Sequence, residues 1–189
     1  FFVSYDYQDA NKWKGDGIQR QQQANAKFVQ PLGDHVKLTL FGDWSLRQEN
    51  DYQDLSLATI KQYGYRVDNI TGNYPLAKQI GYAYQNNTPY PAGIGTTNYN
   101  SAPDFVYYNA AGLRQDAMGY GRFDFDITSK LKAYATVYGH TNSGEGVWVT
   151  PYTPTPEALG GSPLSARTTE YGIHREGFMG GVTYKIGTH

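Results

Sequence analysis

Cysteine is absent from the 189 residues, which excludes disulfide scaffolds, cysteine-based zinc sites and thiol catalysis within this chain. Sixteen Lys and Arg against seventeen Asp and Glu give a formal net charge of −1. No cationic excess is available to neutralise phosphates, so we expect no nucleic-acid partner. The four histidines show no metal-ligand spacing, and we expect neither a metal nor another cofactor. The sequence has no run of about 18 apolar residues, so a transmembrane helix is not expected.

Tyrosine and glycine are abundant instead. The chain has 18 Tyr, 22 Gly and 9 Pro, and 15% of its residues are aromatic. Aromatic residues favour strands, while Gly and Pro favour turns. The composition therefore indicates an all-β protein.

Residues 35–48 (HVKLTLFGDWSLRQ) alternate most clearly. The even positions are uncharged and mostly large, and the odd positions are polar except for Phe41. A period of two residues predicts a strand with one apolar and one polar face. At a rise of about 3.3 Å per residue and a tilt of about 40°, the apolar face from Val36 to Leu46 spans about 25 Å. That span matches the apolar band of an outer-membrane β-barrel.

The same alternation recurs along the chain and predicts six strands in all. Their expected ranges are 1–8, 18–30, 35–48, 113–127, 131–140 and 171–187.

The predicted connections are alternately long and short. Two are short turns (31–34 and 128–130), and three are longer (9–17, 49–112 and 141–170). In an antiparallel up-and-down barrel this order places every turn at one end and every long loop at the other, as in transmembrane barrels. Six strands are fewer than the smallest such barrels have. Both ends of the chain also fall within strand-like patterns, so we expect a segment of a longer mature protein.

Several of these stretches resemble the barrel region of TonB-dependent outer-membrane receptors. They are SYDYQDANKWKGDG (4–17) with the Gln-rich strand after it, LGDHVKLTLFGDW (32–44), the Arg–x–Asp–x–Asp strand 117–127 and GFMGGVTYKIGTH (177–189). Together they cover nearly all of the chain outside its long loops.

The resemblance implies a barrel of about 22 strands that is closed by an N-terminal plug domain. It implies residence in the outer membrane, contact with lipid and lipopolysaccharide, and active uptake of a scarce, bulky solute with energy from the TonB complex. It does not imply an enzyme. The sequence shows no plug domain and no TonB box, so residues for energy coupling are not assigned.

The alternation also predicts which side chains face lipid and which face the lumen. Arg122, Asp124 and Asp126 share one face of their predicted strand. They could form a carboxylate pair for acid–base chemistry, but we interpret them as a charge ladder facing the lumen. Lys37, Asp43 and Arg47 receive the same interpretation. The residues expected to face lipid are Leu38, Leu40, Trp44, Phe123, Phe125, Val182 and Tyr184.

The long loop 49–112 is rich in Tyr, Asn and Gly, a composition that suits capture of a glycan or an aromatic iron chelate. The same tyrosines could instead pack the loops together. Short helices are expected at 55–63 and 155–159, the second with Thr155 as its cap. The candidate substrate contacts are Tyr65, Arg66, Tyr107, Arg114 and Trp148.

Two other functions fit the same patterns. The strands could belong to a passive porin or an outer-membrane adhesin. The chain could also be a soluble carbohydrate-binding protein with a β-fold.

Overall fold

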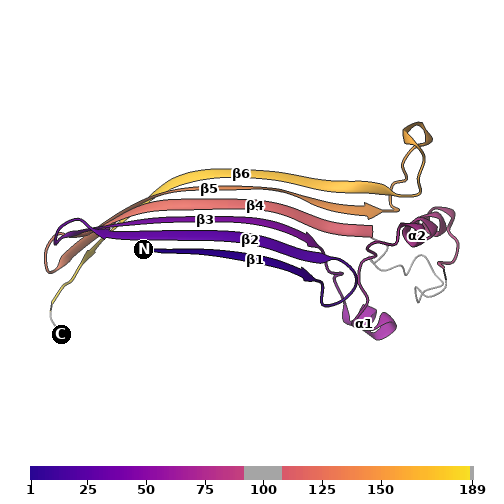
Figure 1. The fold of residues 1–189 in the computed structure, drawn as a ribbon, viewed down its shortest axis with the longest axis horizontal. Helices are drawn as coiled ribbons and strands as arrows, with labels where there is room; N and C mark the ends of the chain where they lie inside the picture. Colours follow the sequence, from indigo (N-terminus) through magenta and orange to yellow (C-terminus); the bar gives the residue numbers. More distant parts are fainter. Residues whose placement is uncertain (92–107, 188–189) are drawn as a thin grey trace.

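A computed structural model describes residues 1–91 and 108–187, and its main feature is one six-stranded antiparallel sheet (Figure 1). The strands lie in the order in which they occur in the chain, so the topology is up-and-down. Within the described ranges the sheet is open, with β1 and β6 as its edges. The strands are β1 (Phe2–Asn11), β2 (Ile18–Pro31), β3 (Val36–Asn50), β4 (Tyr108–Asp126), β5 (Leu131–Thr150) and β6 (Ser165–Tyr184).

The connections are segregated between the two ends of the sheet, as the sequence predicts (Figure 1). The β2–β3 turn closes with a hydrogen bond from the Leu32 amide to the Val36 carbonyl (2.7 Å), and Gly33 supplies a positive φ of 78°. The β4–β5 turn closes with a bond from the Ile127 amide to the Leu131 carbonyl (3.0 Å). We call this the turn end. The other three connections lie at the opposite end, which we call the loop end.

Five strands extend farther toward the loop end than the alternation predicts: β1 and β3 by two or three residues, and β4, β5 and β6 by five or more. β4 begins at Tyr108 rather than at 113, and the expected loop 141–170 is a strand up to Thr150 and again from Ser165. Residues 141–150 and 165–170 are mostly polar or glycine on both faces, so they carry no period-two signal. Cross-strand pairing, which is continuous from Leu131–Tyr184 to Thr150–Ser165, extends these strands instead.

The loop end carries two helices. α1 (Leu57–Tyr63) falls within the range predicted to be helical, and the Ser56 side chain caps it by accepting from the Thr59 amide. α2 (Tyr74–Asn86) was not predicted, although Asn73 caps its first turn.

The helix predicted at 155–159 is a single 3₁₀ turn, η3 (Glu157–Leu159), and Thr155 does not cap it. The Thr155 hydroxyl instead donates to the Leu164 carbonyl (2.7 Å). None of the described helices is long and apolar enough to cross a membrane.

The buried apolar residues of the described chain lie at the loop end, and of these Ala110, near the start of β4, belongs to the sheet. Ile80 and Ala83 of α2 pack with Tyr90, and burial raises the pKa of Tyr90 to about 12. A Cβ at Gly81 of α2 would lie 2.8 Å from Leu164, so the helix packs directly against the β5–β6 loop.

The sheet itself is a single layer, and large apolar side chains along it are exposed. The chain has an accessible surface of 12205 Å², whereas a compact monomer of this mass would show about 9,000 Å². The loop-end cluster therefore buries apolar surface, but the sheet has no second layer in the described chain.

Candidate functional site: the two faces of the sheet and its loop end

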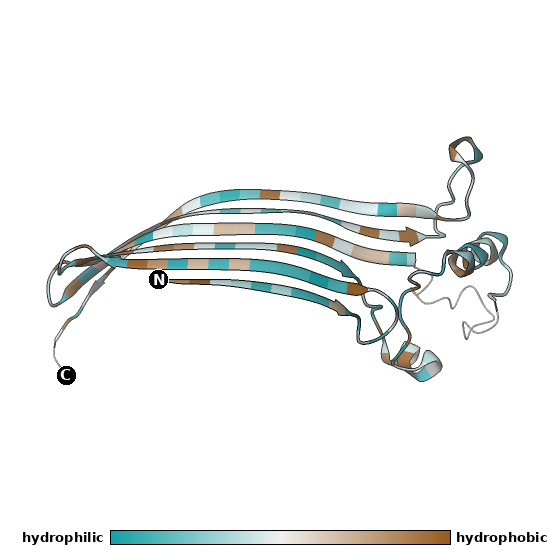
Figure 2. Ribbon diagram, in the orientation of Figure 1, coloured by the Kyte–Doolittle hydropathy of each residue, from teal (hydrophilic) through white to brown (hydrophobic). Residues whose placement is uncertain are grey.

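The cross-strand register assigns the strand residues to one of two faces, apart from the irregular start of β4 at Tyr108–Ala111. Leu40 of β3 pairs with Gly121 of β4, and the same row continues through Val137 of β5 to Phe178 of β6. Because side chains alternate along a strand, this row defines an apolar face on all six strands. Figure 2 shows hydrophobic and hydrophilic residues interspersed along these strands. The seven residues expected to face lipid all lie on it: Leu38, Leu40, Trp44, Phe123, Phe125, Val182 and Tyr184.

The apolar band runs diagonally across this face. Toward the loop end, the border on each strand is the first polar side chain other than tyrosine on the apolar face. On β1 it is Asp9, in the row of Arg20 and Gln48, and on β2 to β5 it is Gln22, Gln48, Gln115 and Thr141, in the rows of β3 residues 46, 48, 46 and 44. On β6 it is Glu176, which lies in the row of Gly42. When each border residue is traced through the pairing to its row on β3, the border moves from the row of residue 48 at β1 to the row of residue 42 at β6. The shift is six residues over five strand spacings.

The shift fixes the inclination of the band. Six residues correspond to about 20 Å along a strand, and five strand spacings correspond to about 24 Å. For the apolar band to lie parallel to a membrane plane, the strands would therefore have to tilt by about 40° from the membrane normal. Strands of transmembrane barrels tilt by about 35–45°.

Aromatic residues border the band on both sides. Tyr5, Tyr7 and Trp44 lie toward the loop end. Phe123 and Phe125 lie toward the turn end, with ring centroids 6.1 Å apart and planes inclined by 17°. Such borders are typical of the two water interfaces of a membrane protein.

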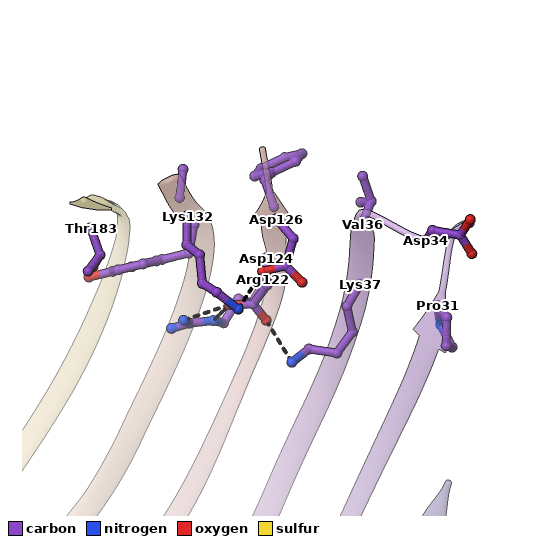
Figure 3. A pocket seen from close by; sticks show the side chains of 13 residues that line it. Pro31, Asp34, Val36, Lys37, Arg122, Asp124, Asp126, Lys132 and Thr183 are labelled. Atoms are coloured by element: carbon purple, nitrogen blue, oxygen red, sulfur yellow. Dashed lines mark hydrogen bonds and ion pairs between the residues drawn. The ribbon is translucent and has the colours of Figure 1, made fainter. Parts of the chain in front are cut away.

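The opposite, polar face carries all six residues predicted to face a lumen, and four of the charged ones are paired at the turn end. The Arg122 guanidinium contacts Asp124 at 2.7 Å, the Lys37 ammonium lies 3.4 Å from the other oxygen of Asp124, and Lys132 lies 2.7 Å from Asp126. These side chains converge over a hollow of about 460 Å³ (Figure 3). Each carboxylate is compensated by a cation, which suits a charge ladder.

The two other predicted residues lie farther along β3. Asp43 accepts a hydrogen bond from the Gln23 side chain (3.2 Å). Arg47 forms an ion pair with Glu49 (3.3 Å) near the loop end.

Tyrosine rings lie across glycines on the polar face. Tyr134 and Tyr138 of β5 are paired with Gly181 and Gly177 of β6. A Cβ at Gly177 would lie 2.6 Å from the Tyr138 ring, so only glycine leaves room for it. The Arg122 guanidinium stacks on Tyr134 at 4.1 Å from the ring centroid. Cross-strand pairing of an aromatic ring with a glycine is one of the devices that fix the register of a sheet.

Sequence reasoning missed a polar network in the middle of this face. His140 Nε2 lies 3.1 Å from Asp116 Oδ2, which also accepts from the Asn142 side chain. Arg175 Nε donates to His140 Nδ1 at 2.9 Å. Because Nδ1 accepts, the proton of a neutral imidazole lies on Nε2, facing the carboxylate. Strand parity places these residues on one face, but only the register brings them together.

The predicted substrate contacts do not form one cluster. Tyr65 and Arg66 follow α1, with the guanidinium 5.7 Å from the Tyr65 ring centroid. Arg114 lies on β4 opposite Gly144, and Trp148 lies four residues farther along β5. Trp148 was expected in a loop, but it is a half-buried strand residue with Arg167 6.0 Å from its ring. Tyr107 lies outside the described residues.

A second feature missed by sequence reasoning is a buried ion pair between two loops. Lys12, after β1, lies 2.6 Å from Asp68, and their side chains are 0% and 3% exposed. Lys12 also donates to the Asp51 carbonyl (2.8 Å), and burial raises the pKa of the Asp51 carboxyl. In residues 1–91 and 108–187, no group of three or more acidic or histidine side chains is arranged to hold a metal.

Comparisons with protein-family models, with curated proteins and with solved structures give no match for this chain.

Proposed function

We propose that this sheet forms part of the transmembrane barrel of a TonB-dependent outer-membrane receptor that takes up a scarce, bulky solute. In this proposal the apolar face contacts lipid, and the polar face with Arg122, Asp124 and His140 lines the lumen. The main support for the proposal is the diagonal course of the apolar band. A sheet in water has no physical reason to shift its apolar residues along the strands from one edge of the sheet to the other.

The open edges of the sheet bear on the same proposal. In hydrocarbon each unpaired backbone group costs several kcal/mol, so β1 and β6 need further strands as neighbours. We propose that other parts of the receptor supply these strands, the plug domain and the contact with the TonB complex.

The arrangement of connections suits the uptake of solutes. The loop end gathers α1, α2 and the 151–164 loop, whereas the turn end has only short reversals. Loops on a rigid scaffold are where binding residues concentrate. We therefore propose that the loop end faces the cell exterior and the turn end faces the periplasm, with oligosaccharides and iron chelates as the candidate solutes.

Depth measurements test the inclination directly. Single nitroxide labels would be placed at Leu40, Phe178 and Val182 of the full receptor in lipid vesicles. The depth of each label is measured from its collision rates with oxygen and with a water-soluble nickel chelate. Leu40 and Phe178 share a row across three strand spacings, so strands inclined by about 40° place Phe178 about 9 Å nearer the outer interface. Val182 lies four residues farther toward the turn end and should match Leu40 in depth. Equal depths for Leu40 and Phe178, or labels in water at all three sites, would refute the proposal.

Trypsin treatment of intact cells tests which end faces outward. Lys61 and Arg66 are exposed at the loop end, and Lys130 is exposed in a turn at the other end. We expect cleavage after Lys61 or Arg66 and protection of Lys130 until the outer membrane is permeabilised. The reverse pattern would show that the turn end is external.

A further inference from the structure

The β1–β2 loop buries lysine side chains and exposes a tryptophan, which is the opposite of the usual pattern. In the sequence Lys12–Trp13–Lys14, both lysines are 6% exposed while the tryptophan between them is 66% exposed. Lysine is among the residues least often buried, and tryptophan is highly buried on average. A fold that buries two ammonium groups and presents an indole to solvent calls for a role for the exposed ring.

The tryptophan is held rigidly in this exposed position. Lys12 is fixed by Asp68, and the Lys14 ammonium donates to the Val67 carbonyl (3.1 Å). The Trp13 amide donates to the Tyr52 hydroxyl (3.0 Å), and the two rings lie 5.9 Å apart with planes inclined by 32°. The ring is therefore a preorganised platform, and binding a ligand to it would order little of the protein.

The platform borders a hollow with polar walls. The hollow measures about 290 Å³, close to the lower end of the range of small-molecule sites (about 300–1,000 Å³). Gln8, Gln21 and Arg47 form one cross-strand row of the polar face beneath Trp13, and Gln19 and Glu49 belong to the next row. The Gln8 side chain is exposed and makes no hydrogen bond to another described side chain, so its amide can both donate and accept.

The two cations that line the hollow, Arg20 and Arg47, are each paired with a carboxylate. Arg47 is paired with Glu49 (3.3 Å), and Arg20 is paired with Asp9 (2.9 Å). Lys12 is neutralised by Asp68, and the buried Lys14 ammonium is directed to a backbone carbonyl. No uncompensated cation lines the hollow among the described residues, which disfavours an anionic ligand.

We propose that Trp13, Tyr52 and the glutamine row form a binding subsite for one sugar ring of a neutral oligosaccharide. The exposed indole stacks on the apolar face of the ring, while Gln8 and Gln21 bond its hydroxyls. The inference deepens the proposed function and rests on it for the position of this site at the outer mouth of the barrel. It selects a glycan over an anionic iron chelate as the solute.

Binding to the purified full receptor in detergent tests the subsite. The probes are maltohexaose, cellohexaose and xylohexaose, with hexagalacturonate as the acidic comparator, measured by calorimetry. We expect at least one neutral probe to bind with little dependence on salt. Trp13→Ala should weaken that binding about tenfold or more, Trp13→Phe should retain most of it, and Gln8→Ala should weaken it about threefold or more. Tyr82→Ala removes a half-exposed ring from α2 and should leave binding unchanged.

Three results would overturn the subsite: no neutral probe binds, Trp13→Ala binds as tightly as the parent, or hexagalacturonate binds more tightly in a salt-dependent way. A thermal unfolding scan of each variant accompanies the titrations. A lowered Tm with unchanged affinity would assign Trp13 a packing role and count against the proposal. The titrations need neither a membrane nor energy coupling, so their failure is distinct from failure of the depth and trypsin experiments.

Discussion

Leu40→Arg is expected to lower the free energy of unfolding of the receptor in lipid by about 2–4 kcal/mol, because Leu40 lies near the middle of the proposed lipid-facing band. The guanidinium would have to leave water for hydrocarbon or distort the bilayer around it. Urea titration of the receptor in vesicles, followed by tryptophan fluorescence, measures the change.

Asp43→Leu on the polar face of the same strand is the matched control. Asp43 accepts one side-chain hydrogen bond, from Gln23, so we expect its replacement to cost about 1 kcal/mol or less. A harmless Leu40→Arg together with a severe Asp43→Leu would show that the two faces are inverted.

Asp68→Asn is expected to destabilise the loop end by about 3–5 kcal/mol, since it leaves the Lys12 ammonium buried without its counter-charge. Asparagine keeps an oxygen that can accept from the amides of Gln53 and Asn69, as Asp68 Oδ1 does now at 2.6 and 3.0 Å. The substitution therefore isolates the charge. Hydrogen exchange should report it as faster exchange at those two amides, by about a hundredfold or more.

Two further variants test whether the loss of stability comes from the unpaired buried charge. Asp126→Asn breaks an ion pair with Lys132 in which both side chains are more than half exposed, and it should cost about 1 kcal/mol or less. Lys12→Met combined with Asp68→Asn removes both charges, keeps the oxygen that accepts from Gln53 and Asn69, and should recover much of the loss. If Asp68→Asn is as mild as Asp126→Asn, the Lys12–Asp68 pair does not hold the loops together.

Several elements could be predicted from the sequence because their signals are local. Alternation along residues 35–48 identified β3 and its two faces, and Pro31 and Gly33 marked the turn before it. Each signal is a property of neighbouring residues, so it can be recognised without knowledge of the rest of the chain.

Alternation failed where both faces of a strand are polar. The second half of β5 and the first part of β6 carry no contrast between faces, so their extent depends on pairing with each other. For that reason Trp148 was placed in a loop although it lies in a strand.

The sequence by itself therefore determined that the chain forms long antiparallel strands with one apolar and one polar face, joined by turns at one end and loops at the other. Only the tertiary structure decided the register. The register sets the diagonal course of the apolar band, joins Asp116, His140 and Arg175, and places Gln8 beside Gln21 and Arg47 below Trp13. The physical reason is that a shift of two residues between strands preserves every face but changes every cross-strand neighbour. The inverted burial of Lys12 and Trp13 was equally invisible in the sequence, because it depends on Asp68, which lies 56 positions along the chain from Lys12.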